Sequence, residues 1–196
     1  MIRLLAARTA TELNVADLAA ELGIPQTTFR RYVPLFETTY IHHSIAAWSG
    51  NVSAKVVKRP KLHLVDSGAA ATLLGTNALA LARPTSTISG QLFETFVAGE
   101  LARQLTWADT DARLYHWRDR DGKEVDLLLE AADGRVVGVE VKASVDVGAD
   151  ALSGLKYLQS RLGDRFVAGF VVHCAERVMP AGPGLWTIPA SALWQW

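Results

Sequence analysis

The feature that most constrains the fold is a pair of apolar runs near the middle of the chain, each with charged groups at alternate positions. Successive side chains of a strand point to opposite faces. In residues 137–142 the valines therefore share one face, and Glu140 and Lys142 share the other. The run at residues 123–130 alternates in the same way and carries Asp126. A short segment with an Asp-Gly pair separates the runs and predicts a hairpin turn, so we expect Asp126 to lie beside Glu140.

Composition places the chain among soluble globular proteins. Its 196 residues are 49% apolar and 20% charged, which allows one large or two small domains. No apolar run reaches the roughly 18 residues that a membrane span needs, and the N-terminal segment is too short for a signal peptide. We therefore expect a cytoplasmic protein with no membrane partner. The single cysteine, Cys174, excludes an internal disulfide and follows an apolar run, so we expect it in the core.

Charge divides the chain into two parts. Residues 1–62 carry eight basic and four acidic groups, which leaves twelve basic and sixteen acidic groups in residues 63–196. A basic first part and an acidic second part suggest different roles, although the formal net charge is zero.

The first part has the pattern of a helix-turn-helix. Asn14 is a suitable N-cap for a helix over residues 15–22, Gly23 ends that helix, and a second helix starts after Ile24. Two predicted strands then flank the basic segment 55–61, so residues 1–75 read as a winged-helix domain.

Two uses of this domain remain open. In one, the second helix enters a DNA groove and the wing contacts phosphates. In the other, the domain only docks onto another domain or protein. The candidate nucleic-acid-binding residues are Gln26, Thr27, Arg30 and Arg31 on the second helix and Lys55, Lys58, Arg59 and Lys61 in the wing.

The second part is predicted to be α/β, more narrowly α+β. After a linker at residues 76–89, residues 90–196 begin with an amphipathic helix up to residue 105. Three strands, a helix and a further strand follow, which gives the order αβββαβ. The strands are expected at residues 113–118, 123–130, 135–142 and 165–174, and the second helix at residues 149–162.

This order resembles the core of the PD-(D/E)xK, or restriction-endonuclease-like, nuclease superfamily. Asp126 and the Glu140-Val141-Lys142 triplet match its central motif, although Val125 stands where the superfamily's name has proline. Glu94, on the preceding helix, matches an acidic residue that many members carry there.

The resemblance extends over nearly the whole chain. Together with Leu64-Val65-Asp66-Ser67-Gly68, the segments at residues 90–101, 117–126 and 139–144 look like the C-terminal domain of unknown function of a bacterial and archaeal AAA-type ATPase family. That resemblance implies an ATPase module as partner, in cis or in trans. The chain itself has no Gly-x-x-x-x-Gly-Lys-Ser/Thr phosphate-binding loop, so ATP hydrolysis is not expected of it.

The resemblance implies a Mg²⁺ or Mn²⁺ site that hydrolyses DNA phosphodiesters. Asp126 and Glu140, with the Val141 carbonyl, are the expected metal ligands, and Glu94 is the candidate for a second ion or its water shell. Lys142 is expected to orient the attacking water and offset charge in the transition state.

A non-catalytic alternative also fits the sequence. Glu-x-Lys is a short pattern, and an ion pair between Glu140 and Lys142 on a solvated strand face is an ordinary feature. Folds host many functions, so the second part can be a DNA- or protein-binding regulatory domain that keeps the nuclease fold as a scaffold. The sequence gives neither the substrate's strandedness nor the oligomeric state.

Overall fold

The computed structural model describes residues 1–50, 59–82 and 86–195. It divides into two compact units. Unit 1 comprises Met1–Ile45 and Arg59–Gly99, and unit 2 comprises Ala46–Lys58 and Glu100–Trp196. Strand β2 (His42–Ala47) and helix α6 (Thr87–Gln104) each contribute residues to both units. The mixed α/β class expected from the sequence is confirmed.

Among the described residues, unit 1 consists mainly of helices with a few short strands. Its other elements are α1 (Ile2–Ala7), β1 (Thr11–Glu12), α2 (Val15–Glu21), α3 (Gln26–Thr38), β3 (Lys61–Leu64), α4 (Ser67–Leu73) and α5 (Ala78–Leu81). Strand β3 pairs antiparallel with both β1 and β2.

The predicted helix pair of unit 1 is present as α2 and α3. The Asn14 side chain caps α2 by accepting a hydrogen bond from the Ala16 N–H at 3.2 Å. Gly23 follows with φ +65°, a left-handed conformation that ends the helix at little cost for glycine. Leu18 and Phe29 then bury their side chains in a core shared with Leu62 of β3.

Residues 76–89, predicted as a linker, contain α5 and the start of α6. The Asn77 side chain caps α5 by accepting from the Ala80 N–H at 3.0 Å. Part of the predicted wing, residues 51–58, lies outside the described residues.

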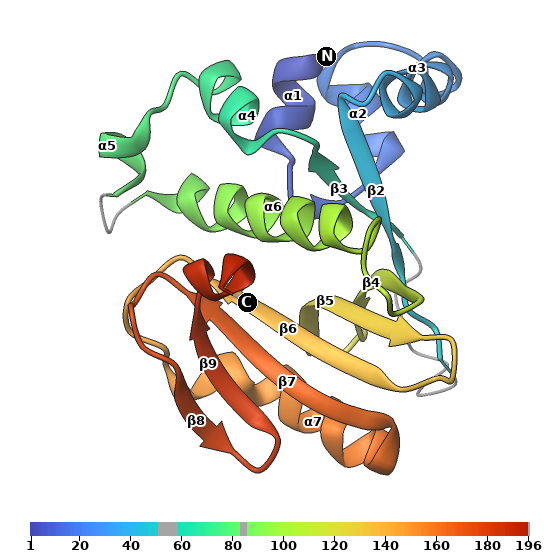
Figure 1. Cartoon of the computed structure of the whole chain (residues 1–196). Coiled ribbons are helices and arrows are strands. Elements are labelled where there is room, and N and C mark those ends of the chain that lie inside the picture. Colours follow the sequence, from blue (N-terminus) through green and yellow to red (C-terminus); the bar gives the residue numbers. More distant parts are fainter. Residues whose placement is uncertain (51–58, 83–85, 196) are drawn as a thin grey trace. The chain divides into compact units, whose positions relative to one another are not determined.

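Unit 2 is built on a mixed sheet (Figure 1). Its strands are β4 (Ala112–Arg118), β5 (Glu124–Ala131), β6 (Val136–Lys142), β7 (Phe166–His173), β8 (Met179–Gly182) and β9 (Leu185–Pro189), and its helices are η1 (Ala149–Leu152), α7 (Ser153–Leu162), η2 (Gly163–Arg165) and η3 (Ala190–Trp194). Strands β4, β5 and β6 are antiparallel, whereas β6, β7 and β9 run parallel. Helix, three strands, helix and strand follow one another in the expected order.

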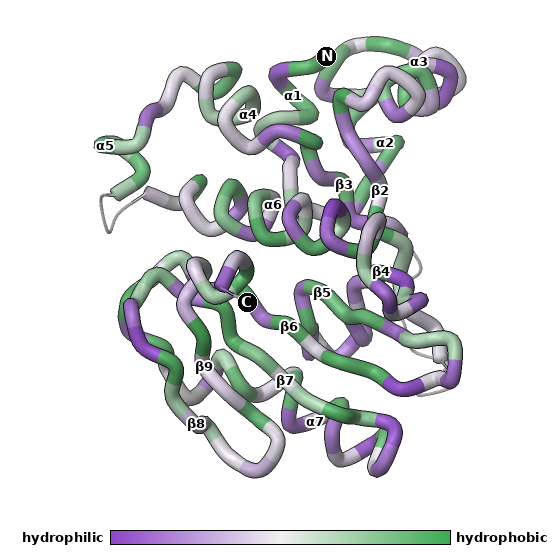
Figure 2. The backbone as a smooth tube through the Cα atoms, viewed as in Figure 1, coloured by the Kyte–Doolittle hydropathy of each residue, from purple (hydrophilic) through white to green (hydrophobic). Residues whose placement is uncertain are grey.

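The core of unit 2 lies between the sheet and α7. Leu155 and Leu158 of α7 are fully buried, together with Trp117, Leu128 and Val171 of the sheet. Figure 2 shows hydrophobic residues along much of β5, β6 and β7. This apolar packing fixes the strands whose ends carry the charged groups.

Residues 46–48 complete the sheet and core of unit 2. Ala46 and Ala47 pair in parallel with Tyr115 and His116 of β4, and the Trp48 N–H donates to the His116 carbonyl at 2.7 Å. Trp48 is only 2% exposed within the unit 2 core. Sequence reasoning assigned these residues to the first domain.

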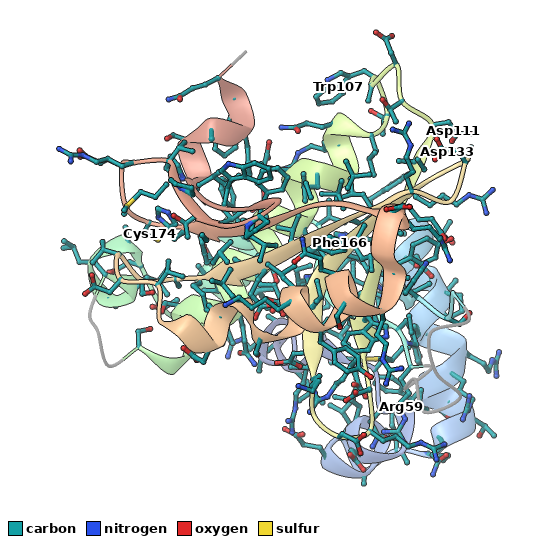
Figure 3. All side chains as sticks on the ribbon, turned by 90° about the horizontal axis from the view of Figure 1, so that it is seen from below. Arg59, Trp107, Asp111, Asp133, Phe166 and Cys174 are labelled. Atoms are coloured by element: carbon teal, nitrogen blue, oxygen red, sulfur yellow. The ribbon has the colours of Figure 1, made fainter. Side chains whose placement is uncertain are left out.

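Cys174 corrects another expectation, because it is exposed (Figure 3). Strand β7 ends at His173, so the thiol follows the last residue of the strand instead of continuing its buried pattern. Within the described residues, no helix is long and apolar enough to cross a membrane.

Candidate functional site

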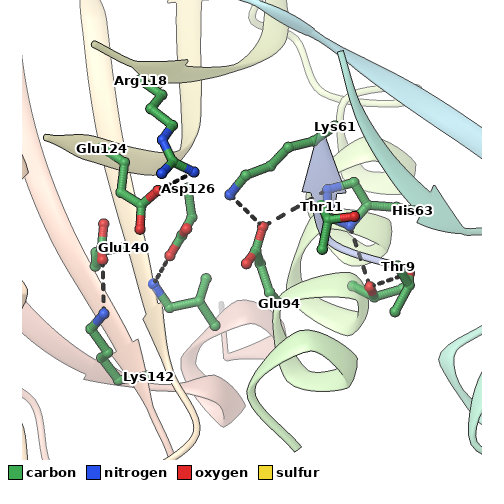
Figure 4. A network of polar contacts seen from close by, with 12 residues as sticks. Thr9, Thr11, Lys61, His63, Glu94, Arg118, Glu124, Asp126, Glu140 and Lys142 are labelled. Atoms are coloured by element: carbon green, nitrogen blue, oxygen red, sulfur yellow. Dashed lines mark hydrogen bonds and ion pairs between the residues drawn. The ribbon is translucent and has the colours of Figure 1, made fainter. Parts of the chain in front are cut away.

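A β-bulge in β5 sets the position of Asp126. Tyr115 pairs with Leu128 and Trp117 pairs with Val125, so Asp126 and Leu127 together oppose the single residue between Tyr115 and Trp117 of β4. Bulges bend a strand and change the direction of a side chain. The Asp126 carboxylate thus accepts a hydrogen bond from a β6 backbone amide, the Val141 N–H, at 3.0 Å (Figure 4).

The β5–β6 register brings the predicted carboxylates together. Leu127 pairs with Val139 and Leu128 with Gly138. The paired stretch ends at Leu127 and Val139, and the next residues along the two strands are Asp126 and Glu140. After burial, the charge of Asp126 is the next largest cause of the raised pKa of Glu140, as expected for a nearby carboxylate. Asp126 and Glu140 therefore lie close together in unit 2, as the sequence alternation predicts.

Glu140 is an almost completely buried acid, with 5% of its surface exposed. Its Oε1 accepts a hydrogen bond from the Lys142 ammonium at 2.9 Å, while its buried Oε2 has no hydrogen-bond partner among the described residues. Burial and the charge of Asp126 raise the pKa of Glu140 to about 8, against the opposing effect of Lys142. Without a bound cation, the neutral form is favoured at neutral pH.

Lys142 keeps its charge at this site. Burial lowers its pKa, but the charge of Glu140 and the hydrogen bond to it act in the opposite direction, and Asp126 and Asp150 add to them. The net result is a raised pKa. Lys142 is thus an ammonium donor within reach of Glu140, as its position two residues along the same strand predicts.

Two acidic neighbours were not singled out from the sequence. Glu124, on β5, adds to the raised pKa of Glu140 and lies 3.5 Å from the Arg118 guanidinium. Asp150, in η1, acts on Lys142. Glu124 is two residues from Asp126 on the same strand, so the spacing indicates that it is near the site. Asp150 is near the site only because η1 lies beside β6.

The unit 2 residues fit a hard divalent ion. The unpartnered Glu140 Oε2 is a buried carboxylate oxygen of the type that Mg²⁺ and Mn²⁺ bind, and Asp126 is the adjacent second carboxylate. Residues 1–50, 59–82 and 86–195 contain no group of three or more His, Cys, Asp or Glu side chains arranged to hold a metal. A two-carboxylate site suits Mg²⁺, which usually retains several of its waters.

Glu94 belongs to unit 1 and is held there by a buried ion pair. Its Oε1 accepts from the Lys61 ammonium at 2.9 Å, with 7% of the Lys61 and 13% of the Glu94 side chain exposed. The His63 Nε2 lies 3.9 Å from the same oxygen, and the His63 Nδ1 lies 3.3 Å from the Thr95 hydroxyl (Figure 4). Sequence reasoning did not foresee this network.

The candidate DNA-binding residues differ in accessibility. The four on α3 are all exposed: Gln26, Thr27, Arg30 and Arg31. Arg59 is also exposed, but Lys61 is buried in its pair with Glu94, which argues against a phosphate contact. Lys55 and Lys58 lie outside the described residues.

Comparison with known proteins places most of the chain in families without an assigned function. Residues 89–193 match the family described as Domain of unknown function (DUF4143), and residues 1–80 match Domain of unknown function (DUF8612). Uncharacterized protein Rv2008c of Mycobacterium tuberculosis and Uncharacterized protein Mb2031c of Mycobacterium bovis are each 30% identical over 182 residues. The match covers 91% of this chain and 38% of each relative, so the chain spans little more than a third of their length.

Among solved structures, no significant match was found. Because the first family match extends over more than half of the sequence, the chain belongs to the DUF4143 family.

Proposed function

We propose that unit 2 is a metal-dependent nuclease domain with a restriction-endonuclease-like core, which hydrolyses phosphodiester bonds of DNA. The observation that carries the proposal is the buried, unpartnered Glu140 Oε2, beside Asp126 and with Lys142 on the same strand. A buried carboxylate oxygen without a donor is costly unless a cation or a proton satisfies it. The αβββαβ order of elements supports the same assignment.

In this proposal Asp126, Glu140 and the Val141 carbonyl would hold Mg²⁺ or Mn²⁺. When bound, the ion neutralises phosphate charge and promotes ionisation of a water. Asp126 is oriented by its hydrogen bond from the Val141 N–H. Lys142 donates to the attacking water and offsets the negative charge that develops on the phosphate oxygens.

The proposal also extends to unit 1. Residues 1–75 serve as a winged-helix DNA-binding domain, with the exposed Gln26, Thr27, Arg30 and Arg31 of α3 facing the groove. Glu94 stays a predicted contributor to a second metal ion. An AAA-type ATPase module, in cis or in trans, is proposed from the family resemblance, and co-elution of the chain with such a module tests it.

Cleavage assays test the catalytic proposal. The purified chain is incubated with single- and double-stranded DNA in Mg²⁺ or Mn²⁺, beside Asp126→Asn, Lys142→Met and the control Lys156→Ala, an exposed lysine of α7. Cleavage lost in the first two variants and kept in the control supports the proposal. Equal activity in all four proteins identifies a contaminating nuclease, and the assay then gives no support to the proposal.

A regulatory scaffold without catalysis is the second candidate. It is favoured by the Glu140–Lys142 pair, which already occupies one carboxylate oxygen, and by the lack of a three-ligand group in the described part of the chain. The two candidates differ in their response to metal. A nuclease site predicts Mg²⁺-dependent thermal stabilisation that Asp126→Asn abolishes, whereas a scaffold predicts no such stabilisation and no cleavage.

A further inference from the structure

One buried histidine lies beside the proposed catalytic lysine. Strand β7 runs parallel to β6, with Val171 paired to Glu140 and His173 paired to Lys142. Neighbouring strands are about 4.8 Å apart, and paired residues of a parallel ladder point to the same face. His173 therefore shares a face with Glu140 and Lys142, although it is far from both in sequence.

The hydrogen bonding of His173 determines which of its two ring nitrogens carries the proton. Only 2% of the residue is exposed, and its Nδ1 accepts a hydrogen bond from the Ala175 N–H at 2.9 Å. Burial lowers the pKa of His173 below its usual value, which favours the neutral ring. With Nδ1 as acceptor, the proton of the neutral ring is on Nε2. No described residue pairs with Nε2, so this N–H is a donor without a protein partner.

His173 also borders a hollow of about 490 Å³ in unit 2. The loop after β6 and the strands β8 and β9 form its other walls, and its lining includes Asp146, Glu176, Arg177, Met179 and Thr187. Thr187 pairs with Val171, so it lies on the same face of the sheet as His173. The lining combines two carboxylates, a guanidinium, a hydroxyl and apolar groups, which offers hydrogen-bond partners for the hydroxyls of a sugar and apolar surface for a base.

We propose that His173 is a substrate-contacting residue that donates its Nε2–H to the phosphate next to the scissile one, with the attached nucleoside in this hollow. The inference rests on the proposed nuclease function and adds a subsite to it. Lys142 acts at the scissile phosphate, and His173, one strand away, holds the neighbouring nucleotide. No covalent step is assigned to His173.

Two substitutions separate this role from a purely structural one. In His173→Asn the amide reaches as far as Nδ1, so it preserves the bond from the Ala175 N–H and removes the Nε2 donor. In His173→Gln the amide reaches the Nε2 position and the contact with Ala175 is lost. KM and kcat are measured in Mg²⁺ for a short oligonucleotide in its single-stranded and its double-stranded form. The Kd of the same fluorescein-labelled oligonucleotide is measured in Ca²⁺, and thermal unfolding checks each fold.

A substrate contact predicts that His173→Asn keeps its thermal stability while KM and Kd rise about tenfold, and that His173→Gln stays closer to wild type. The inference is overturned if His173→Gln is the more damaging variant, or if neither variant changes KM or Kd. If the wild type cleaves neither the single- nor the double-stranded form, the nuclease proposal fails separately, and the Kd values still decide the role of His173. A wild type that neither cleaves nor binds the oligonucleotide in either form overturns both.

Discussion

The surroundings of Glu140 in the folded chain favour its protonated state. Its pKa rises from 4.5 to about 8 on folding, first through burial and then through Asp126. Between these two values the folded chain retains a proton that the unfolded chain has released. The unfolding free energy of the metal-free protein therefore falls as pH rises through this window.

The corresponding prediction concerns Glu140→Gln. The substitution removes the titrating group, so the variant should gain stability relative to wild type as pH rises from 4.5 to 8, by about a few kcal/mol. Urea unfolding without metal, at both ends of this window, measures the difference. Exposed Glu176→Gln is the matched control. A pH-independent difference between Glu140→Gln and wild type would contradict the raised pKa.

The Lys61–Glu94 pair gives a second prediction for single residues. Glu94→Gln leaves the Lys61 ammonium buried without its carboxylate, and we expect a loss of about 3 kcal/mol in unfolding free energy. Lys61→Met added to Glu94→Gln should recover part of that loss, because both charges are then absent. Urea unfolding of the three proteins checks this result. Cleavage restored together with stability would show that Glu94 acts through the fold and not as a metal ligand.

Among the elements, the contact of α7 with β5 tolerates the least change. A Cβ atom added at Gly154 would lie 1.8 Å from the backbone carbonyl oxygen of Glu124. That oxygen cannot move away without disturbing the strand that carries Asp126. Glycine at this point lets α7 approach the sheet closely.

We therefore predict that Gly154→Ala destabilises the protein by about 3 kcal/mol or more, through displacement of α7 from β5. Gly90→Ala is the control, because a Cβ at this exposed position of α6 meets nothing within 4 Å. The control should be neutral or stabilise the protein by about 0.5–1 kcal/mol, as expected for alanine in a helix. Urea unfolding distinguishes the two, and similar stabilities would contradict the close contact.

Local signals predicted several elements well. Alternation gave β5 and β6 within a residue or two, and glycines at positive φ, Gly122 and Gly134, end the two turns that the sequence indicated. The side-by-side placement of Asp126, Glu140 and Lys142 followed from the same alternation. These features depend only on residues close together in the chain, so they can be predicted from a single sequence.

Features that depend on pairing between distant segments were not predicted. The bulge at Asp126 is visible only in the register with β4, and the place of His173 beside Lys142 requires the parallel pairing of β6 and β7. Lys61 looked like a phosphate-binding lysine within a basic run, but a helix 33 residues away supplies its partner, Glu94. Sequence spacing contains no direct signal for such contacts.

At the scale of the whole molecule, the two units are proposed to divide DNA binding and cleavage. Arg30→Ala combined with Arg31→Ala should weaken binding to duplex DNA and lower the slope of log K against log salt by about 1.8, because two phosphate contacts are lost. Fluorescence anisotropy over a salt series measures the slope. Arg3→Ala with Arg113→Ala, two exposed arginines outside α3, is the control. An equal decrease of the slope in the control would show that any lost positive charge weakens binding, whatever its position. No decrease in the α3 variant would favour the docking role of unit 1.

A fragment of residues 90–196 gives a further prediction at this scale. The fragment lacks Trp48 and the β2 residues that pair with β4 in unit 2. Loss of a fully buried tryptophan costs about 3–5 kcal/mol even when only the side chain is removed. We expect the fragment to unfold at lower urea concentration than the whole chain, as monitored by circular dichroism. A fragment as stable as the whole chain would contradict this role of Trp48.

The position of Trp48 also bears on how such chains are inherited. The two family matches, residues 1–80 and 89–193, look like two consecutive blocks, yet a side chain from the first block fills the interior of unit 2. A recombination event that joins the second block to a foreign first block removes Trp48 from that interior. Exchange of the first block for an unrelated one is therefore expected to destabilise unit 2.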